Sequence, residues 1–359
     1  MSQIDTTTAN AEATEEFTGT VLDDVAGFIM TLLSAIGERH GLFRALADGP
    51  ASSAELAERT GTDERYVREW LRAMAAAEYV VHDRSNGSYT LPAAHAGVLA
   101  DENSPYFFGG PFQMVFGYLG IVERVAAAFR EGGGAPQSAY GPDLWEGMAR
   151  FTNGWFEHLL LADWLPAVPG VRRKLEQGAR LADVGCGAGT GLIRLAREFP
   201  HARLTGYDVS PEQLELARTG IAQAGLADRV ELRLADVSQG LSERYDVVTT
   251  FDVVHDAVDP LGLMRGIRAA LEDDGSYLML EIKSADDPAD NVGVLPQFLY
   301  GASIFYCMTT SLARGGAGLG TCGMPEAKVR ELGAQAGFDS VAVAPITENP
   351  FNVLYELRP

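Results

Sequence analysis

Apolar residues in the first hundred positions recur with the period of a helix. Residues 21–47 predict an apolar helix pair, and the segment 63–79 carries its apolar residues at positions i, i+3, i+4 and i+7. Ser52 and Glu55 stand at capping-box spacing, and Thr62 occupies the N-cap position of the helix that follows it. The N-terminal part of the chain is therefore predicted to be mostly helical.

Beyond these helices the pattern changes to alternation of apolar and polar residues. Segments 79–84 and 88–91 alternate on either side of Asn86-Gly87, a dipeptide typical of a two-residue hairpin turn. Helices followed by a β-hairpin in this order predict a winged helix over residues 21–100.

Short apolar strands alternate with helical segments in the second half of the chain. Strand patterns cover 181–184, 203–209, 229–237, 245–251 and 275–282, and this alternation predicts a parallel sheet covered by helices. At 359 residues the chain is long enough for two domains. The predicted organisation is a disordered N-terminus at 1–20, a winged-helix domain at 21–100, a helical connector with substrate-pocket residues at 101–165 and an α/β domain at 166–359.

The first of these strands runs directly into a glycine-rich turn, LADVGCGAGTG at residues 181–191. Its glycines leave the turn bare, so that a ligand could lie against the backbone and reach unpaired N–H groups at the start of the next helix. A dinucleotide fingerprint is excluded because the sixth residue is Thr190 counted from Gly185 and Leu192 counted from Gly187. No Lys-Ser or Lys-Thr pair follows, which excludes a P-loop.

The pattern D-x-G-x-G-x-G in this turn resembles motif I of class I S-adenosylmethionine (SAM) methyltransferases. Asp208 ends the next strand, where it can accept hydrogen bonds from both ribose hydroxyls. Asp236 ends the third strand, where the resemblance implies a contact to the adenine amino group. The residues expected to bind the cofactor are Asp183, Gly185, Cys186, Gly187, Gly189, Asp208, Val209, Asp236, Val237, Phe251 and Asp252.

The resemblance extends to the strand that ends near residue 251. The following segment, VVHDAVDP, is similar to the LHDWxD stretch of SAM-dependent small-molecule O-methyltransferases, in which the histidine is the general base. It departs from that stretch at Ala257, where the family usually has tryptophan. His255 is therefore expected to be the base, and either Asp256 or Glu281 could orient its ring or balance its charge.

The same resemblance implies a Rossmann-like, seven-stranded methyltransferase domain that closes with an antiparallel pair at 340–346 and 352–359. Aromatic residues are frequent in the connector and in the insertion between 283 and 324. Organic substrates are normally bound by apolar and aromatic walls. The substrate-pocket residues expected on this basis are Trp145, Phe151, Trp155, Phe156, Phe298 and Tyr306. The glycine-rich segment 313–323 is interpreted as a mobile flap.

Composition limits the partners of the protein. Its formal net charge of −21 disfavours polyanionic nucleic acid and anionic membranes. The longest apolar run, 25–36, is shorter than the roughly 20 residues that a membrane span needs. The polar N-terminus is not a signal peptide, and three cysteines without metal-ligand or paired spacing favour a reducing cytoplasm. We therefore expect a cytoplasmic protein without a membrane partner.

A winged helix can bind DNA, but the charge of this one argues against it. Residues 20–100 contain seven basic and eleven acidic residues, and the second helix of the motif carries acids of its own. In the methyltransferases that the chain resembles, this module is a dimerisation domain. The expected partner is accordingly a second copy of the chain, and no nucleic acid.

The predicted function is a SAM-dependent methyltransferase that acts on a hydroxyl of a hydrophobic or aromatic small molecule and releases S-adenosylhomocysteine. A C-methyltransferase on an enolisable or olefinic metabolite would use the same cofactor cradle. Related enzymes that hold a metal for this purpose need further histidines, and none follows His255, so no metal is expected. A SAM-sensing winged-helix regulator and a SAM-binding fold that no longer methylates are the remaining alternatives.

Overall fold

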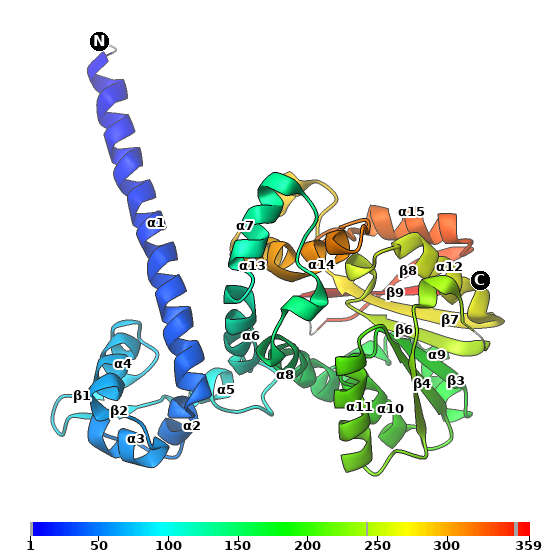
Figure 1. Ribbon diagram of the computed structural model, residues 1–359, viewed down its shortest axis with the longest axis horizontal. Helices are drawn as coiled ribbons and strands as arrows, with labels where there is room; N and C mark the ends of the chain where they lie inside the picture. Colours follow the sequence, from blue (N-terminus) through cyan, green and yellow to red (C-terminus); the bar gives the residue numbers. More distant parts are fainter. Residues whose placement is uncertain (1–2, 242, 348–350) are drawn as a thin grey trace. The chain divides into compact units, whose positions relative to one another are not determined.

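The structure is a computed structural model that describes residues 3–241, 243–347 and 351–359, with the backbone alone for residues 3–9 (Figure 1). It divides into two compact units. Unit 1 comprises Met1–Phe116 with Glu146–Phe151, and unit 2 comprises Gly117–Trp145 with Thr152–Pro359. The predicted connector at 101–165 is thus shared between the two units.

Unit 1 contains the predicted winged helix. Four helices are followed by a two-stranded antiparallel hairpin, and their apolar faces enclose a core that includes Phe43, Leu56, Leu71 and Met74. The elements are α1 (Gln3–Arg39), α2 (Leu42–Ala47), α3 (Ser53–Thr60), α4 (Glu64–Ala76), β1 (Val81–Asp83), β2 (Ser88–Thr90), α5 (Ala93–Leu99) and the start of α6 (Gly109–Leu119).

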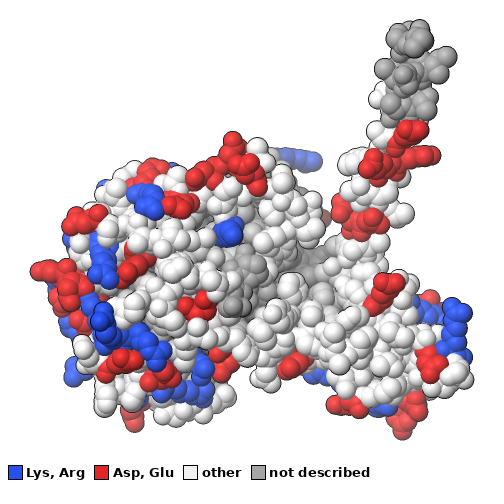
Figure 2. All heavy atoms as spheres, turned by 180° about the vertical axis from the view of Figure 1, so that it is seen from behind, with Lys and Arg blue, Asp and Glu red and all other residues white. Residues whose placement is uncertain are grey.

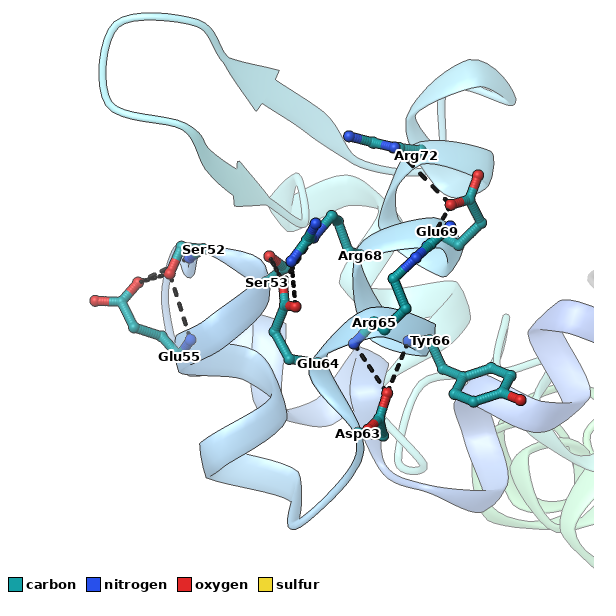
Figure 3. Close-up of polar contacts among 10 residues, drawn as sticks. All are labelled: Ser52, Ser53, Glu55, Asp63, Glu64, Arg65, Tyr66, Arg68, Glu69 and Arg72. Carbon is teal, nitrogen blue, oxygen red and sulfur yellow. Dashed lines mark hydrogen bonds and ion pairs between the residues drawn. The ribbon is translucent and has the colours of Figure 1, made fainter.

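Two local predictions in this unit are wrong. The hairpin turn has four residues, 84–87, because the Asp83 carboxylate accepts hydrogen bonds from Ser85 and the Asn86 side chain accepts one from the Ser88 N–H, which widens the loop. The N-cap of α4 is Asp63, not Thr62. The Asp63 carboxylate accepts the Arg65 and Tyr66 N–H groups (Figure 3). The predicted capping box of α3 is confirmed.

The first helix is longer than the apolar pattern predicts. Disorder is expected for residues 1–20, but α1 begins at Gln3, and the hydroxyls of Thr14 and Thr18 donate to carbonyls one turn back in the helix. By length and composition alone, the part of α1 from Asn10 to Arg39 could cross a bilayer, and 11% of its most apolar window is buried. The expectation that no apolar segment is long enough to span a membrane therefore does not hold for α1 as a whole.

Unit 2 is built on the seven-stranded, mostly parallel sheet that the sequence predicts. The strand order is β5-β4-β3-β6-β7-β9-β8, and β9 runs antiparallel to both of its neighbours. The strands are β3 (Arg180–Val184), β4 (Arg203–Asp208), β5 (Val230–Leu234), β6 (Tyr245–Phe251), β7 (Leu271–Ile282), β8 (Ser340–Ala344) and β9 (Asn352–Arg358).

Helices bury both faces of this sheet (Figure 1). One face packs Ala182, Val248 and Met279 against helices α12 (Pro260–Ala270) and α15 (Glu326–Ala336). The other face packs against helices on its opposite side. These include α9 (Pro169–Glu176) and α10 (Thr190–Glu198). The order of strands reverses between β3 and β6, which makes the crevice beyond their carboxyl ends the expected ligand site.

Unit 2 contains further α-helices and π-helical turns. They are the end of α6, α7 (Val122–Glu131), the parts of α8 (Pro142–His158) outside 146–151, the π-helical turn Leu160–Trp164, α11 (Pro211–Gln223), α13 (Val294–Ala302), the π-helical turn Ser303–Cys307 and α14 (Met308–Ala313).

Candidate active site

The glycine turn after β3 has the backbone that its sequence predicts. Gly185, Gly187 and Gly189 have φ values of 72°, 52° and 77°, a region that residues with side chains rarely adopt. A Cβ atom on Gly185 would lie 2.5 Å from a methyl carbon of Val253. Gly189 is the N-cap of α10. The loop is therefore a bare cradle that leads into a helix N-terminus.

Asp208 holds this cradle in place. Its carboxylate accepts the Gly187 N–H at 2.9 Å and the Ser210 N–H at 2.8 Å. Burial raises the pKa of Asp208. Two oxygens offer about four acceptor positions, so the carboxylate can accept further donors from a ligand. The Ser210 N–H donates to Asp208, and the Ser210 hydroxyl caps α11 by accepting the Gln213 N–H.

Asp183 lies at the end of the strand below the cradle. It is 3% exposed and accepts a hydrogen bond of 2.7 Å from the Thr249 hydroxyl. Burial raises the pKa of Asp183 to about 7. The neighbouring Cys186 is buried, and burial raises the pKa of its thiol, which therefore stays protonated.

The other predicted cofactor residues differ in their surroundings. Val209, which follows Asp208, is 40% exposed, whereas Val237 is 2% exposed and belongs to the core beside α12. Asp236 accepts hydrogen bonds from the N–H and the hydroxyl of Ser238. Phe251, at the end of β6, stacks on a tryptophan ring and meets Phe156 edge to face at 5.1 Å. Of this group, the Val237 side chain has the least access to a ligand.

The most densely charged buried spot follows β6. Nδ1 of His255 lies 2.6 Å from Oε2 of Glu281, and Oε1 of Glu281 accepts the Val254 N–H at 2.8 Å. On the other side of the ring, Nε2 lies 3.2 Å from Oδ1 of Asp256. His255 and Glu281 are 3% and 0% exposed. Both predicted carboxylates therefore lie beside the imidazole, and Glu281 lies closer.

Burial and these charges change the pKa of His255, Asp256 and the nearby Asp252. Burial alone would lower the pKa of His255, but the Glu281 and Asp256 carboxylates raise it well above its ordinary value. Burial raises the pKa of Asp256. Burial, with the nearby Glu281 charge, also raises the pKa of Asp252 to about 7. Asp252 has a strained φ of 57° and accepts a hydrogen bond from Asn352 at 2.6 Å.

Cys307 is a member of this site that the sequence does not reveal. Its thiol interacts with both His255 and Asp256, and burial raises its pKa to about 12. It ends the π-helical turn after α13. Only the helical packing of the insertion brings it to His255, so spacing along the chain gives no signal for it.

Aromatic side chains form a wall next to Asp256 and Cys307. The rings of Tyr140, Trp145 and Tyr306 meet edge to face with centroids 5.7–6.1 Å apart. Burial raises the pKa of Tyr306, and the nearby Asp256 carboxylate raises it further. Trp145 and Tyr306 thus lie together as expected, and Tyr140 joins them.

The other predicted pocket residues are more dispersed. Trp155 stacks on Phe351 at 5.4 Å, and Phe156 packs against Phe251. Phe298 is 37% exposed on α13. Phe151 belongs to unit 1, where it packs against the ring of Phe108. These residues do not form one cluster with Trp145.

The glycine-rich segment predicted to be a flap is tied to the loop after His255. The Ala317 N–H donates to the Val258 carbonyl at 2.9 Å, and the Ser311 hydroxyl donates to the Ala257 carbonyl at 3.0 Å. The segment and the α14 residue just before it are therefore hydrogen-bonded to the loop that carries His255.

Comparisons with known proteins identify the families to which both parts of the chain are similar. Residues 28–101 match the family described as Rv2258c-like winged HTH domain, and residues 175–299 match the family described as methyltransferase domain. A 3-hydroxy-5-methyl-1-naphthoate 3-O-methyltransferase of Streptomyces sahachiroi is 31% identical over 300 residues, which cover 76% of this chain and 80% of that protein.

A shorter similarity concerns a much larger protein. Polyketide synthase ThaQ of Burkholderia thailandensis is 37% identical over 111 residues, which cover 31% of this chain and only 5% of the synthase. This match relates one segment of the synthase to the chain and nothing more.

Solved structures share the fold over nearly the whole chain. Mitomycin 7-O-methyltransferase MmcR has a TM-score of 0.70 at 21% identity and covers 98% of this chain and 100% of its own. PigF, solved with S-adenosylhomocysteine (SAH), has a TM-score of 0.73 at 20% identity and covers 95% and 99%.

Proposed function

Since the chain belongs to the class I SAM-dependent methyltransferases that carry an N-terminal winged-helix domain, we propose that it methylates a hydroxyl of a hydrophobic or aromatic small molecule, with His255 as the general base. The similarity to a naphthoate O-methyltransferase supports an aromatic acceptor. The observation that carries the proposal is the buried His255–Glu281 pair beside the aromatic wall of Trp145 and Tyr306.

The residues of the cradle fit SAM. Gly185 and Gly187 leave the backbone bare, and the Asp208 carboxylate retains acceptor positions for the ribose hydroxyls. Asp236 would accept the adenine amino group. When bound, SAM supplies an electrophilic methyl group on a sulfonium, so the residues of the chain have mainly to position the acceptor.

The proton of the acceptor hydroxyl needs a base. Glu281 holds Nδ1 of His255, which leaves Nε2 as the nitrogen that can take the proton. With SAM bound, the sulfonium would supply the methyl group and leave as neutral SAH, and the proton of the acceptor hydroxyl would pass to Nε2 of His255. The carboxylates of Glu281 and Asp256 stabilise the imidazolium that results.

Label transfer tests this function. The full-length protein is incubated with methyl-labelled SAM and a panel of phenols, naphthols and hydroxynaphthoates, and products are identified by mass spectrometry. We expect an O-methyl product, which His255→Ala lowers by about 10²- to 10⁴-fold while calorimetry shows unchanged SAM affinity. His201→Ala, at an exposed histidine of the same unit, is the matched control. Label on carbon, or full activity of His255→Ala, would contradict the proposal.

We also propose that α1 pairs with α1 of a second copy. Leu22, Val25, Ile29, Leu32 and Ile36 are spaced alternately by three and four residues, which is the spacing of a coiled-coil seam. Except for the half-buried Leu32, they are at least 43% exposed. A closed two-fold pair is the commonest way to bury such a surface.

The composition of α1 supports a second copy over a bilayer. Asp23 and Asp24 lie in the middle of the part that could span, where charged residues are costly. No basic residue precedes Arg39 in this helix, and the charged side chains along α1 in Figure 2 are acidic. Such a helix is not attracted to anionic lipid headgroups. We propose accordingly that the dimer is cytoplasmic.

The winged helix offers DNA little free positive charge. On α4, Arg68 pairs with Glu64, and Arg65 and Arg72 both pair with Glu69 (Figure 3). Arg59 donates instead to three backbone carbonyls of its own unit. Since phosphate binding needs unpaired cations, these pairs support a dimerisation module.

A further inference from the structure

Three side chains with different metal-ligand atoms meet at the Nε2 edge of the His255 ring. His255, Asp256 and Cys307 each offer a ligand atom within 4.8 Å of the other two, and Nε2 is the ring nitrogen that faces Asp256. We propose that these three side chains form a zinc site, and that Zn²⁺ bound there inhibits methyl transfer by occupying the nitrogen that acts as the base. The inhibition rests on the function proposed above, whereas the binding of the metal does not.

The chemistry of the donor set selects the metal. Imidazole nitrogen, carboxylate oxygen and thiolate sulfur are the three ligand types that zinc takes in proteins. Magnesium and calcium prefer oxygen ligands alone. A site with one nitrogen, one oxygen and one sulfur therefore favours zinc.

Asp256 provides a second, independent observation. Its Oδ1 atom is buried, and among the described residues it has no hydrogen-bond donor other than Nε2 of His255 at 3.2 Å, which can donate only when the imidazole is protonated. A buried acceptor without a donor is costly, and most such atoms in proteins are satisfied. A cation between Asp256 and His255 would satisfy this oxygen, which faces Nε2 at 3.2 Å.

Glu281 supplies the outer shell that such a site needs. Histidines that bind metals almost always donate their second ring N–H to a carboxylate or carbonyl, which fixes the tautomer. Here Glu281 lies 2.6 Å from Nδ1, and its other oxygen is fixed by the Val254 N–H. This arrangement directs the lone pair of Nε2 towards Asp256 and Cys307.

A second group of ligands, Asp252, His255 and Glu281, is also compact but already engaged. Oδ1 of Asp252 accepts from Asn352, and both oxygens of Glu281 accept from Val254 and His255. These carboxylates are therefore neighbours of the proposed site and are not available as ligands of the metal.

Binding requires the loss of protons from two ligands. Zn²⁺ forms bonds to Sγ of Cys307 and Nε2 of His255 as the thiol proton and the imidazolium proton on Nε2 leave to solvent, and no electron is transferred. Three protein ligands leave a fourth position for water or another donor. The site is therefore a reversible inhibitory site that a chelator can empty.

Cobalt substitution tests the binding without any methyl acceptor. Metal-free full-length protein is titrated with Co²⁺, and we expect a thiolate-to-cobalt charge-transfer band that Zn²⁺ displaces at one equivalent. Cys307→Ser should abolish the band and weaken zinc binding by about 100-fold or more. Cys322→Ser is the matched control in the same insertion and should keep both. No band in the wild type, or a band that survives in Cys307→Ser, would overturn the site.

A second variant guards against a folding defect in Cys307→Ser. Asp256→Asn keeps the thiol and should weaken zinc binding at least about tenfold; unchanged affinity would overturn the site. For inhibition, zinc should slow wild-type methyl transfer, and EDTA should restore it. Zinc that binds without slowing the reaction would refute the inhibitory role, while absent methyl transfer with an intact cobalt band would refute only the proposed function.

Discussion

Nδ1 of His255 lies 2.6 Å from a carboxylate oxygen of Glu281, and that carboxylate also holds the backbone N–H of Val254. Glu281 therefore fixes both the imidazole ring and the start of the loop that carries it. Asp256 contacts the other nitrogen at 3.2 Å from within the same loop. The two carboxylates, which the sequence leaves as equal candidates, have different geometric roles.

Glu281→Gln should lower the methyl-transfer rate more than Asp256→Asn. Glutamine keeps an oxygen for the Val254 N–H but loses the charge that orients the ring and stabilises the imidazolium, so we expect a loss of about 10- to 10³-fold. The pH–rate midpoint should also move down, because the Glu281 carboxylate raises the pKa of His255. SAM affinity, measured by calorimetry, should change little. A larger effect of Asp256→Asn would reverse the assignment of the orienting carboxylate.

Asp208→Ala should weaken SAM binding at least about tenfold, or roughly 1.4 kcal/mol, because a charge-assisted contact to the ribose is lost. Calorimetry measures the affinity, and Asp228→Asn, at an exposed carboxylate of the same unit, is the control. NAD should not bind to either protein. Unchanged SAM affinity in Asp208→Ala would leave Asp208 only the structural contacts to Gly187 and Ser210.

Asp183 makes stability depend on pH. Its pKa is raised to about 7 from an ordinary 3.8, so the folded state holds a proton that the unfolded chain releases. Stability therefore falls as pH rises from about 4 to about 7, by up to about 1.4 kcal/mol per pH unit from this group. Asp183→Asn should remove this fall.

Chemical denaturation at several pH values tests the role of Asp183. The free energy of unfolding of Asp183→Asn minus that of the wild type should increase with pH across this window and level off above it. The same difference for Asp228→Asn should stay flat. A flat difference for Asp183→Asn would show that the buried carboxyl does not titrate there.

Much of unit 2 is predictable because local patterns define it. The glycines after β3 require positive φ. Asp208 ends one strand and His255 follows another, and the carboxyl ends of these strands must meet at one edge of a parallel sheet. Such features depend on a few consecutive residues and on the order of the strands. The positions of the glycine cradle and of His255 were therefore within reach of the sequence.

Other features depend on packing over long sequence distances. Cys307 reaches His255 only through the fold of the insertion, and an apolar helical pattern does not specify which face meets that loop. Phe151 and Trp155 lie one turn apart on α8 but in different units, so their shared aromatic character did not place them together. The N-cap at Asp63 and the four-residue hairpin turn depend on side-chain hydrogen bonds. These compete closely with a cap at Thr62 and with a two-residue turn.

The exposed seam of α1 leads to a prediction about assembly. Leu22 and Ile29 are 66% and 48% exposed, so replacing them should not disturb the core of unit 1. If the seam pairs two copies, the double variant Leu22→Glu/Ile29→Glu places four carboxylates in the apolar interface and should convert a dimer into a monomer. Light scattering coupled to gel filtration at micromolar concentration measures the mass.

Thr20→Glu is the matched control because Thr20 lies on the opposite side of α1, about 160° around the helix from Leu22. It adds the same charge outside the seam and should remain a dimer. A monomeric wild type would refute the pairing of α1. Sedimentation with lipid vesicles tests whether α1 instead inserts into a bilayer. An inserted helix would carry the wild-type protein into the pellet, whereas a helix buried in a dimer would leave it in the supernatant. Because Asp23 and Asp24 would then sit within the hydrocarbon, we expect the supernatant.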